Sequence, residues 1–179
     1  MKFFNYVRGR VAAGYGAFGK WLGDSKLMNG LIYDCNLEKR AWDSGLAQAT
    51  YPESIMTQYP YRGYAVVKKE YTTTLTAYDI EMMFRDMLYN EREQLLLAYP
   101  KLSRVGCSSF SKNFTEGRKH LTIACIFDTK PPEDFKIEEP KDEFEENYCK
   151  IDNDCIYTSG SKCFEKLCYV PPHIYANGH

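Results

Sequence analysis

The chain has 179 residues, of which 44% are hydrophobic and 26% are charged, and its formal net charge is −1. These values are those of an ordinary globular protein and exclude wholesale disorder. The small net charge excludes a global field that would draw the chain onto nucleic acid or an anionic membrane, and no apolar run reaches the roughly 18 residues of a membrane span. All three histidines lie after residue 119, which argues against histidine-based metal or acid–base chemistry before that point.

The first half of the chain predicts two helices and a strand. Apolar periodicity predicts a helix over residues 1–14 and a second helix over roughly 36–49, capped by Asp34 or Asn36. Residues 50–62 hold two prolines and three tyrosines and are expected to form a loop. Residues 63–69 are then expected to form a short strand.

The clearest helix follows residues 76–79, whose Thr-Ala-Tyr-Asp sequence resembles a capping box. Its apolar residues recur at helical spacing, as in a helix that faces the core: Ile80, Met83, Phe84, Met87 and Leu88. Residues 95–98 are expected to form a short apolar turn, and two strands follow at 104–111 and 119–127. His120 lies on the opposite face of the second strand from its apolar residues, so we expect an exposed histidine without a catalytic role.

The composition changes after residue 132. Residues 133–146 contain eight acidic side chains and two lysines, which predicts a solvated linker over 133–147. The expected domains are therefore a main domain at 1–132 and a cysteine-rich tail at 148–179.

Seven cysteines are a high count for this length. Four lie in the tail with the spacing C-x5-C-x7-C-x4-C, which lacks the C-x2-C pairs of a zinc ribbon: Cys149, Cys155, Cys163 and Cys168. This spacing predicts two structural disulfides and an oxidising compartment, with a connectivity that spacing does not assign. Cys35, Cys107 and Cys125 remain, so one of them is free or pairs with the tail, and we expect a buried, inert thiol.

An oxidising compartment implies secretion, yet the chain opens at Met1 without an apolar signal segment. We therefore expect either that a signal peptide was removed and Met1 added, or that the natural chain begins further upstream. If the chain is secreted, the sequon that begins at Asn113 predicts N-glycosylation there.

Five motifs occur in order along the chain: FNYVR at 4–8, LIYDCNLE at 31–38, RVGC at 104–107, ACIF at 124–127 and a proline pair at 131–132. Together they resemble the CAP superfamily of cysteine-rich secretory, antigen-five and pathogenesis-related-1 proteins. The nematode activation-associated secreted, or venom-allergen-like, type is the most similar. The resemblance implies an α+β fold: a three-layer α/β/α sandwich with a central antiparallel sheet, followed by a small disulfide-rich tail.

Zinc-binding members of this family use two histidines and two glutamates in a central cleft. The motifs place the corresponding positions at Phe4, Tyr64, Asp86 and Glu93. Only two carboxylates remain, whereas zinc prefers nitrogen or sulfur donors. The resemblance therefore implies a degenerate cleft, with no catalytic residue, no metal and no cofactor. Nematode members also usually carry a second cysteine where this chain has Gln48.

The resemblance implies a secreted, non-enzymatic protein that binds a host protein or cell-surface receptor, as a parasite effector or immunomodulator does. No nucleic-acid partner is expected. The tyrosine-rich stretch 51–78 is the candidate contact surface, because tyrosine offers a large contact area at low entropy cost. Its proposed residues are Tyr59, Tyr61, Tyr64 and Tyr71. A long loop that packs over the core would contain the same rings.

The second hypothesis is a lipid or sterol carrier, which would need an apolar groove. The candidate lining residues are Met82, Met83, Phe84 and Met87, which periodicity also assigns to the core. The third hypothesis, a hydrolase or metal-dependent enzyme, lacks the cleft residues on which it would depend.

Overall fold

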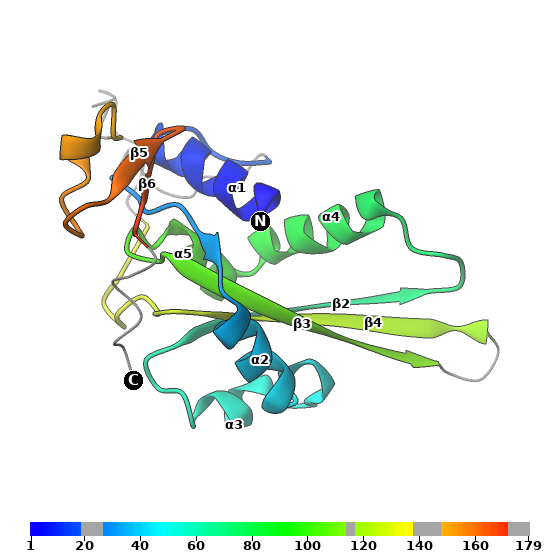
Figure 1. Ribbon diagram of the computed structural model, residues 1–179. Coiled ribbons are helices and arrows are strands. Elements are labelled where there is room, and N and C mark those ends of the chain that lie inside the picture. The colour runs from blue at the N-terminus through cyan, green and yellow to red at the C-terminus, as the bar shows by residue number, and fades with distance from the viewer. Residues whose placement is uncertain (19–26, 114–116, 138–147, 172–179) are drawn as a thin grey trace. The chain divides into compact units, whose positions relative to one another are not determined.

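The computed structural model describes residues 1–18, 27–113, 117–137 and 148–171 (Figure 1). The chain divides into two compact units. Unit 1 comprises Met1–Ile32, Leu95–Ser103 and Pro131–His179, and unit 2 comprises Tyr33–Gln94 and Arg104–Lys130. Both units are assembled from segments far apart in the sequence. The domain boundaries expected from composition remain a prediction, and the acidic linker falls mainly outside the described residues.

Unit 2 is built on an antiparallel sheet. Strands β2 (Gly63–Tyr71) and β3 (Arg104–Asn113) each pair with β4 (Lys119–Phe127). The order is β1-β3-β4-β2, with β1 (Ile32–Tyr33) only two residues long. The three longer strands confirm those expected from the alternating pattern, and β2 and β3 each extend beyond their predicted ends.

Helices cover both sides of this sheet (Figure 1). Helices α2 (Cys35–Asp43) and α3 (Pro52–Met56) lie on one side, and α4 (Ala77–Asp86) lies on the other, along β2. The buried cluster between α2 and the sheet includes Leu37, Ala41, Ala124 and Ile126. This is the three-layer α/β/α arrangement expected from the resemblance.

Asp34 and Gly45 set the two ends of α2. Asp34 caps α2, because its Oδ1 accepts hydrogen bonds from the backbone N–H groups of Asn36 and Leu37 at 2.8 and 3.2 Å. The helix ends earlier than predicted because Gly45 adopts a left-handed φ of 66°, after which the short helix η1 (Leu46–Gln48) begins.

The predicted capping box at the start of α4 is present. The Thr76 hydroxyl accepts from the Asp79 N–H at 3.2 Å, and Asp79 Oδ2 accepts from the Thr76 N–H at 2.9 Å. The short helix η2 (Met87–Tyr89) continues from α4. Met83 and Met87 are buried, as expected for core residues.

The expectations for one loop, one turn and one histidine were wrong. The predicted loop contains α3, whose first residue Pro52 is favourable at the start of a helix. The predicted turn before Pro100 is the end of helix α5 (Glu91–Ala98), which begins in a charged segment without apolar periodicity. His120 is half-buried rather than exposed, because β4 is an inner strand and Glu70 and Lys112 flank it in the register.

In unit 1, helix α1 (Lys2–Ala12) confirms the first predicted helix. Asn5 exchanges two hydrogen bonds with the Leu31 backbone, at 2.9 and 2.7 Å. Arg8 is fully buried, and its guanidinium donates to five backbone carbonyl oxygens at 2.8–3.2 Å: those of Asn29, Leu97, Tyr99, Pro100 and Leu102. The FNYVR motif therefore ties together segments of unit 1 that are distant in the sequence.

The cysteine-rich tail also belongs to unit 1. It contains η4 (Asp152–Asp154) and a hairpin of β5 (Lys162–Phe164) and β6 (Leu167–Tyr169). The Cys168 N–H donates to the Met28 oxygen at 2.8 Å, and the Gly30 N–H donates to the Cys168 oxygen at 2.9 Å. The tail is thus hydrogen-bonded to the segment that follows α1.

Two disulfides link the tail as predicted: Cys149–Cys163 and Cys155–Cys168. A third disulfide, Cys107–Cys125, joins β3 to β4 in unit 2. Cys35 is left free and is exposed, so the expectation of a buried thiol was wrong. None of the helices within the described ranges has the length and apolar character of a bilayer-spanning segment.

Candidate functional site

The four residues predicted to line a degenerate cleft occupy different environments. Phe4 is a buried residue of α1 in unit 1, whereas the other three positions belong to unit 2. Asp86 is exposed at the end of α4. Tyr64 of β2 and Glu93 of α5 take part in one polar cluster, which we call the Arg92 cluster.

The Arg92 cluster consists of Glu53, Tyr64, Arg92 and Glu93. The guanidinium carbon of Arg92 lies 3.9 Å from the centroid of the Tyr64 ring, a cation–π geometry. Arg92 Nη2 donates to Glu93 Oε1 at 2.5 Å, and the Tyr64 hydroxyl donates to Glu53 Oε1 at 3.0 Å. Side chains from α3, β2 and α5 therefore form one continuous chain of polar contacts.

Glu93 is the buried end of the Arg92 cluster. It is only 4% exposed, and its Oε2 is buried without a hydrogen-bond partner. A buried carboxylate is costly unless it is paired, and Arg92 supplies the compensating charge from the more exposed side. The start of α5 holds Arg92 in place, because Asn90 Oδ1 accepts from the Arg92 N–H at 2.9 Å.

The cluster also shifts the acidity of its outer members. Partial burial raises the pKa of the Tyr64 hydroxyl, Arg92 opposes this effect, and the hydrogen bond to Glu53 adds to it. Hydrogen bonding to its own backbone N–H, followed by the bond from the Tyr64 hydroxyl, lowers the pKa of Glu53. Both shifts favour the arrangement in which the phenol donates and the carboxylate accepts.

A divalent cation does not fit the Arg92 cluster. The Arg92 guanidinium already places a positive charge against Glu93 Oε1, and a tyrosine ring lies where a further carboxylate would be needed. Zinc and manganese sites need several convergent oxygen, nitrogen or sulfur donors. The residues present are therefore arranged as an internal ion pair.

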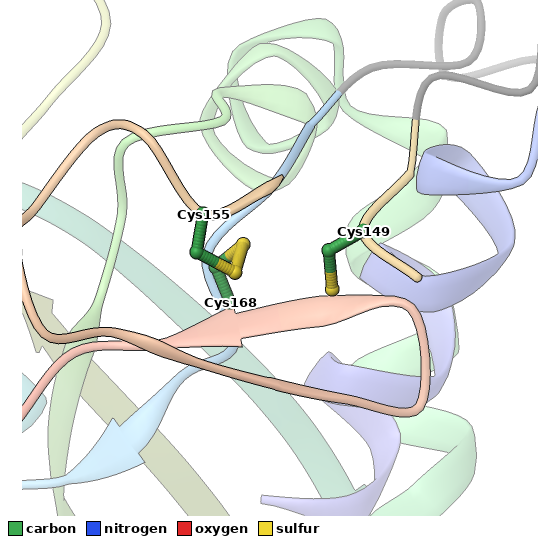
Figure 2. A group of neighbouring side chains, drawn as sticks. All are labelled: Cys149, Cys155 and Cys168. Carbon is green, nitrogen blue, oxygen red and sulfur yellow. A yellow bond between two sulfur atoms is a disulfide. The ribbon is translucent and has the colours of Figure 1, made fainter. Parts of the chain in front are cut away.

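Within the described ranges, one group of three metal-type side chains brings its donor atoms within 4.8 Å: Cys149, Cys155 and Cys168. Figure 2 shows the sulfur of Cys149 near the disulfide between Cys155 and Cys168. Cys149 itself is bonded to Cys163. Because metal ligation requires a thiolate, these oxidised sulfurs form a covalent framework rather than a metal site.

The predicted tyrosine surface divides into exposed and packed residues. Tyr61 is 81% exposed, whereas Tyr59 packs partly against the core cluster of α2. Tyr64 belongs to the Arg92 cluster, and the hydroxyls of Tyr71 and Ser111 are 3.2 Å apart. The separate prediction for Asn113 places a glycan at an exposed residue at the end of β3.

Sequence reasoning missed Arg92. Neighbouring helical residues point in different directions, so the pair Arg92–Glu93 gives no periodic signal of a contact. The contact forms because Glu93 is buried and the longer Arg92 side chain reaches its carboxylate. One signal in the sequence could have indicated this contact: Glu93 is an acidic residue at an inward-facing helical position, and its neighbour is an arginine.

No protein-family model matches the chain, and comparison with curated proteins finds no match. Among solved structures, the Ancylostoma-secreted protein Ac-ASP-7 is 26% identical, with a TM-score of 0.69 over 94% of this chain and 85% of that chain. Its manganese-bound form is also 26% identical, with a TM-score of 0.75 over 98% and 86% of the two chains. BmVAL-1, at 17% identity and a TM-score of 0.60, has the same fold over 95% and 91%.

These similarities cover nearly the whole chain and agree with its motifs. The structure explains two of them, because Asn5 and Arg8 tie together the segments of unit 1 and Gly106 lies directly against α2. The chain therefore belongs to the CAP superfamily and is similar to the venom-allergen-like proteins of helminths.

Proposed function

We propose that this protein is secreted and acts by binding a host protein or a cell-surface receptor, without catalysis. The observation that carries the proposal is the exposure of Tyr51 and Tyr61, which are 73% and 81% exposed on either side of α3. Large exposed aromatic side chains are the kind that anchor protein interfaces. Both belong to the stretch expected to form the contact surface.

The Arg92 cluster supports a role without catalysis. The buried carboxylate of Glu93 is paired with Arg92, and the Tyr64 hydroxyl donates to Glu53. A general base or a metal ligand needs a carboxylate that is available to substrate or ion. In this arrangement both carboxylates are instead engaged by side chains of the protein itself, Glu93 by Arg92 and Glu53 by Tyr64.

Secretion is supported by two further observations. The three disulfides are of the kind that persist in oxidising compartments. The similar solved structure Ac-ASP-7 is named as a secreted protein. An extracellular protein with exposed tyrosines and an internally paired Arg92 cluster is suited to binding a partner on a cell.

The proposal is tested by flow cytometry of the labelled, oxidised protein on a panel of blood and immune cells. We expect saturable binding that the double variant Tyr51→Ser/Tyr61→Ser weakens by about tenfold or more, since interface aromatics carry much of the binding energy. Tyr89→Ser is the matched control, because Tyr89 is 72% exposed in η2 and lies outside the stretch 51–78.

Absence of saturable binding on every cell type would contradict the proposal. Equal binding by the double variant would contradict the assignment of the surface. Native mass spectrometry then tests the lipid-carrier alternative, in which an apolar ligand is retained by the purified protein. That alternative would require the buried side chains of Met83 and Met87 to line a groove.

A further inference from the structure

The free cysteine lies on an outward-facing stripe of α2. Positions i, i+3, i+4 and i+7 of a helix share one side, and here they are occupied by Cys35, Glu38, Lys39 and Trp42. Trp42 is 61% exposed, which is unusual for so large a side chain on a helix whose other side is in the core.

This stripe forms one wall of a groove with a volume of about 440 Å³, within the range of roughly 300–1,000 Å³ typical of small-ligand sites. The opposite wall is β3. The full lining is Cys35, Glu38, Lys39, Trp42, Cys107, Ser108 and Ser109. All seven residues belong to unit 2, and we call this feature the α2–β3 groove.

The β3 wall is a sheet edge. The Asp34 N–H donates to the Val105 oxygen at 2.9 Å, after which the chain leaves the sheet and enters α2. Alternate residues of a strand direct their peptide groups to the same edge. Cys107 and Ser109 therefore use the same edge as Val105, at a point where β1 has already ended. The Tyr33 hydroxyl donates to the Cys107 oxygen at 3.2 Å. The next peptide group on that edge, at Ser109, faces the groove.

Ser108 adds an independent observation. It shares a face of β3 with Gly106, where a Cβ would lie 2.0 Å from the Glu38 nitrogen, so this face is turned toward α2. Ser108 is 8% exposed, and its hydroxyl oxygen is buried without a hydrogen-bond partner. An unsatisfied buried hydroxyl is unfavourable, and rotation of the Ser108 side chain toward the groove that it lines would let a polar group of a ligand satisfy it.

The charges at the groove match a small zwitterionic ligand. Glu38 offers one carboxylate, and Lys39 offers one ammonium group that also pairs with Asp43 on the solvent side. A short peptide presents the complementary ammonium and carboxylate, together with a backbone that can pair with a strand edge. A cysteine in such a peptide would supply the sulfur with which the free Cys35 thiol can form a disulfide.

We propose that the α2–β3 groove binds a short cysteine-containing peptide of the glutathione type, which becomes linked to Cys35 as a mixed disulfide. The Cys35 thiolate attacks one sulfur of the peptide's symmetric disulfide. The sulfur–sulfur bond of that disulfide breaks, and a new bond joins Cys35 to one peptide. The second peptide leaves as a thiolate and takes up the proton lost by Cys35.

The test exposes the oxidised full chain to glutathione disulfide and follows the intact mass with time. We expect the protein to gain one glutathione, mapped to Cys35 after proteolysis, and Cys35→Ser to gain none. Trp42→Ala should slow the reaction several-fold, whereas Tyr78→Ala, which removes an equally exposed ring outside the groove, should leave the rate unchanged.

Alkylation by iodoacetamide separates binding from thiol reactivity. We expect the wild type and Trp42→Ala to be alkylated at Cys35 at the same rate, because this small reagent does not use the groove. The proposal is overturned if no adduct forms, or if Trp42→Ala reacts with glutathione disulfide as fast as the wild type. It is also overturned if the product is a Cys35–Cys107 disulfide or a dimer linked through Cys35.

Discussion

Two arginines of this protein use the same planar group for different purposes. Arg8 is fully buried in unit 1 and donates to backbone carbonyl oxygens from two distant segments. Arg92 is partly exposed in unit 2 and compensates the buried carboxylate of Glu93. A guanidinium suits both tasks because it presents five donors in a fixed plane and keeps its charge.

Removing the Arg8 side chain should strongly destabilise the fold. Arg8→Met leaves buried carbonyl oxygens, including those of Asn29 and Leu97, without their donors. Because unsatisfied buried groups are costly, we expect a loss of about 3–5 kcal/mol in the free energy of unfolding, measured by urea denaturation. Lys2→Met, at an exposed position of the same helix, is the matched control. Equal losses in the two variants would refute this role of Arg8.

Loss of the Arg92 side chain should lower the free energy of unfolding by less than loss of the Arg8 side chain. Arg92→Gln leaves Glu93 buried without a cation, and we expect a loss of about 1–2 kcal/mol, because solvent screens the exposed part of Arg92. Arg92→Lys should recover part of this loss. A double-mutant cycle with Glu93→Gln measures the coupling, and additive effects would show that the ion pair contributes nothing.

At the scale of the element, the capping box of α4 predicts a pH dependence. The hydrogen bond from Lys69, together with those from Thr76, lowers the pKa of Asp79 below its ordinary value of 3.8. A lowered pKa in the folded state means that this contribution is fully present above pH 3.8 and is lost as the pH falls further. We expect Asp79→Asn to lower the Tm at pH 7, and the difference from the wild type to shrink in acid.

A difference in Tm that stays constant from pH 7 into acid would contradict the charge-based account. Thr76→Ala is a complementary variant, because it removes the cap without changing a titrating group. We expect it to cost about 1 kcal/mol with a weaker pH dependence than Asp79→Asn, because the hydrogen bond from Lys69 to Asp79 remains, and we expect Thr76→Ser to restore stability.

The contact between β3 and α2 predicts a strict requirement for glycine. A Cβ at position 106 would lie 2.0 Å from the Glu38 nitrogen and 2.6 Å from the Asp34 oxygen, and both are backbone atoms. Gly106→Ala must therefore displace α2, and we expect a loss of about 3 kcal/mol in thermal or urea denaturation. Ser109→Ala, on the exposed part of the same strand, should change stability little.

Elements with a strong pattern could be predicted from the sequence, and elements defined by backbone geometry could not. Strand β4 matched its predicted bounds because its alternation is clear, and the cap of α4 was readable from its residues. The early end of α2 depends on the left-handed Gly45, and the short helix α3 lies among residues typical of loops.

The candidate site shows the same division. Motif spacing selected Tyr64 and Glu93, which the fold brings into one cluster, but it also selected Asp86, which is exposed at the end of α4. The Arg92 contact depends on which way a long side chain turns. That choice is set by burial in three dimensions, so no spacing along the sequence indicates it.

At the scale of the whole molecule, the tail disulfides should support the strand pairing of unit 1. Cys155–Cys168 closes a segment with a sequence separation of 13, and its second cysteine is hydrogen-bonded to Met28 and Gly30. We expect replacement of both cysteines by serine to cost about 3 kcal/mol and to speed hydrogen exchange of the Gly30 amide. Replacement of Cys149 and Cys163 is the control, because that bridge closes a similar segment without these bonds.

Unit 1 is assembled from three separate segments of the chain, and this has a consequence for its folding during synthesis on the ribosome. Its segment Met1–Ile32 is made before unit 2, whereas β6, which bonds to Met28 and Gly30, is made after all of unit 2. Unit 2 ends at Lys130, so all of its strands emerge before the first tail cysteine, Cys149. The order of translation thus allows Cys107 and Cys125 to meet while the tail thiols are still unmade. Because the chain is made from one end to the other, fewer non-native disulfides are available to its seven cysteines.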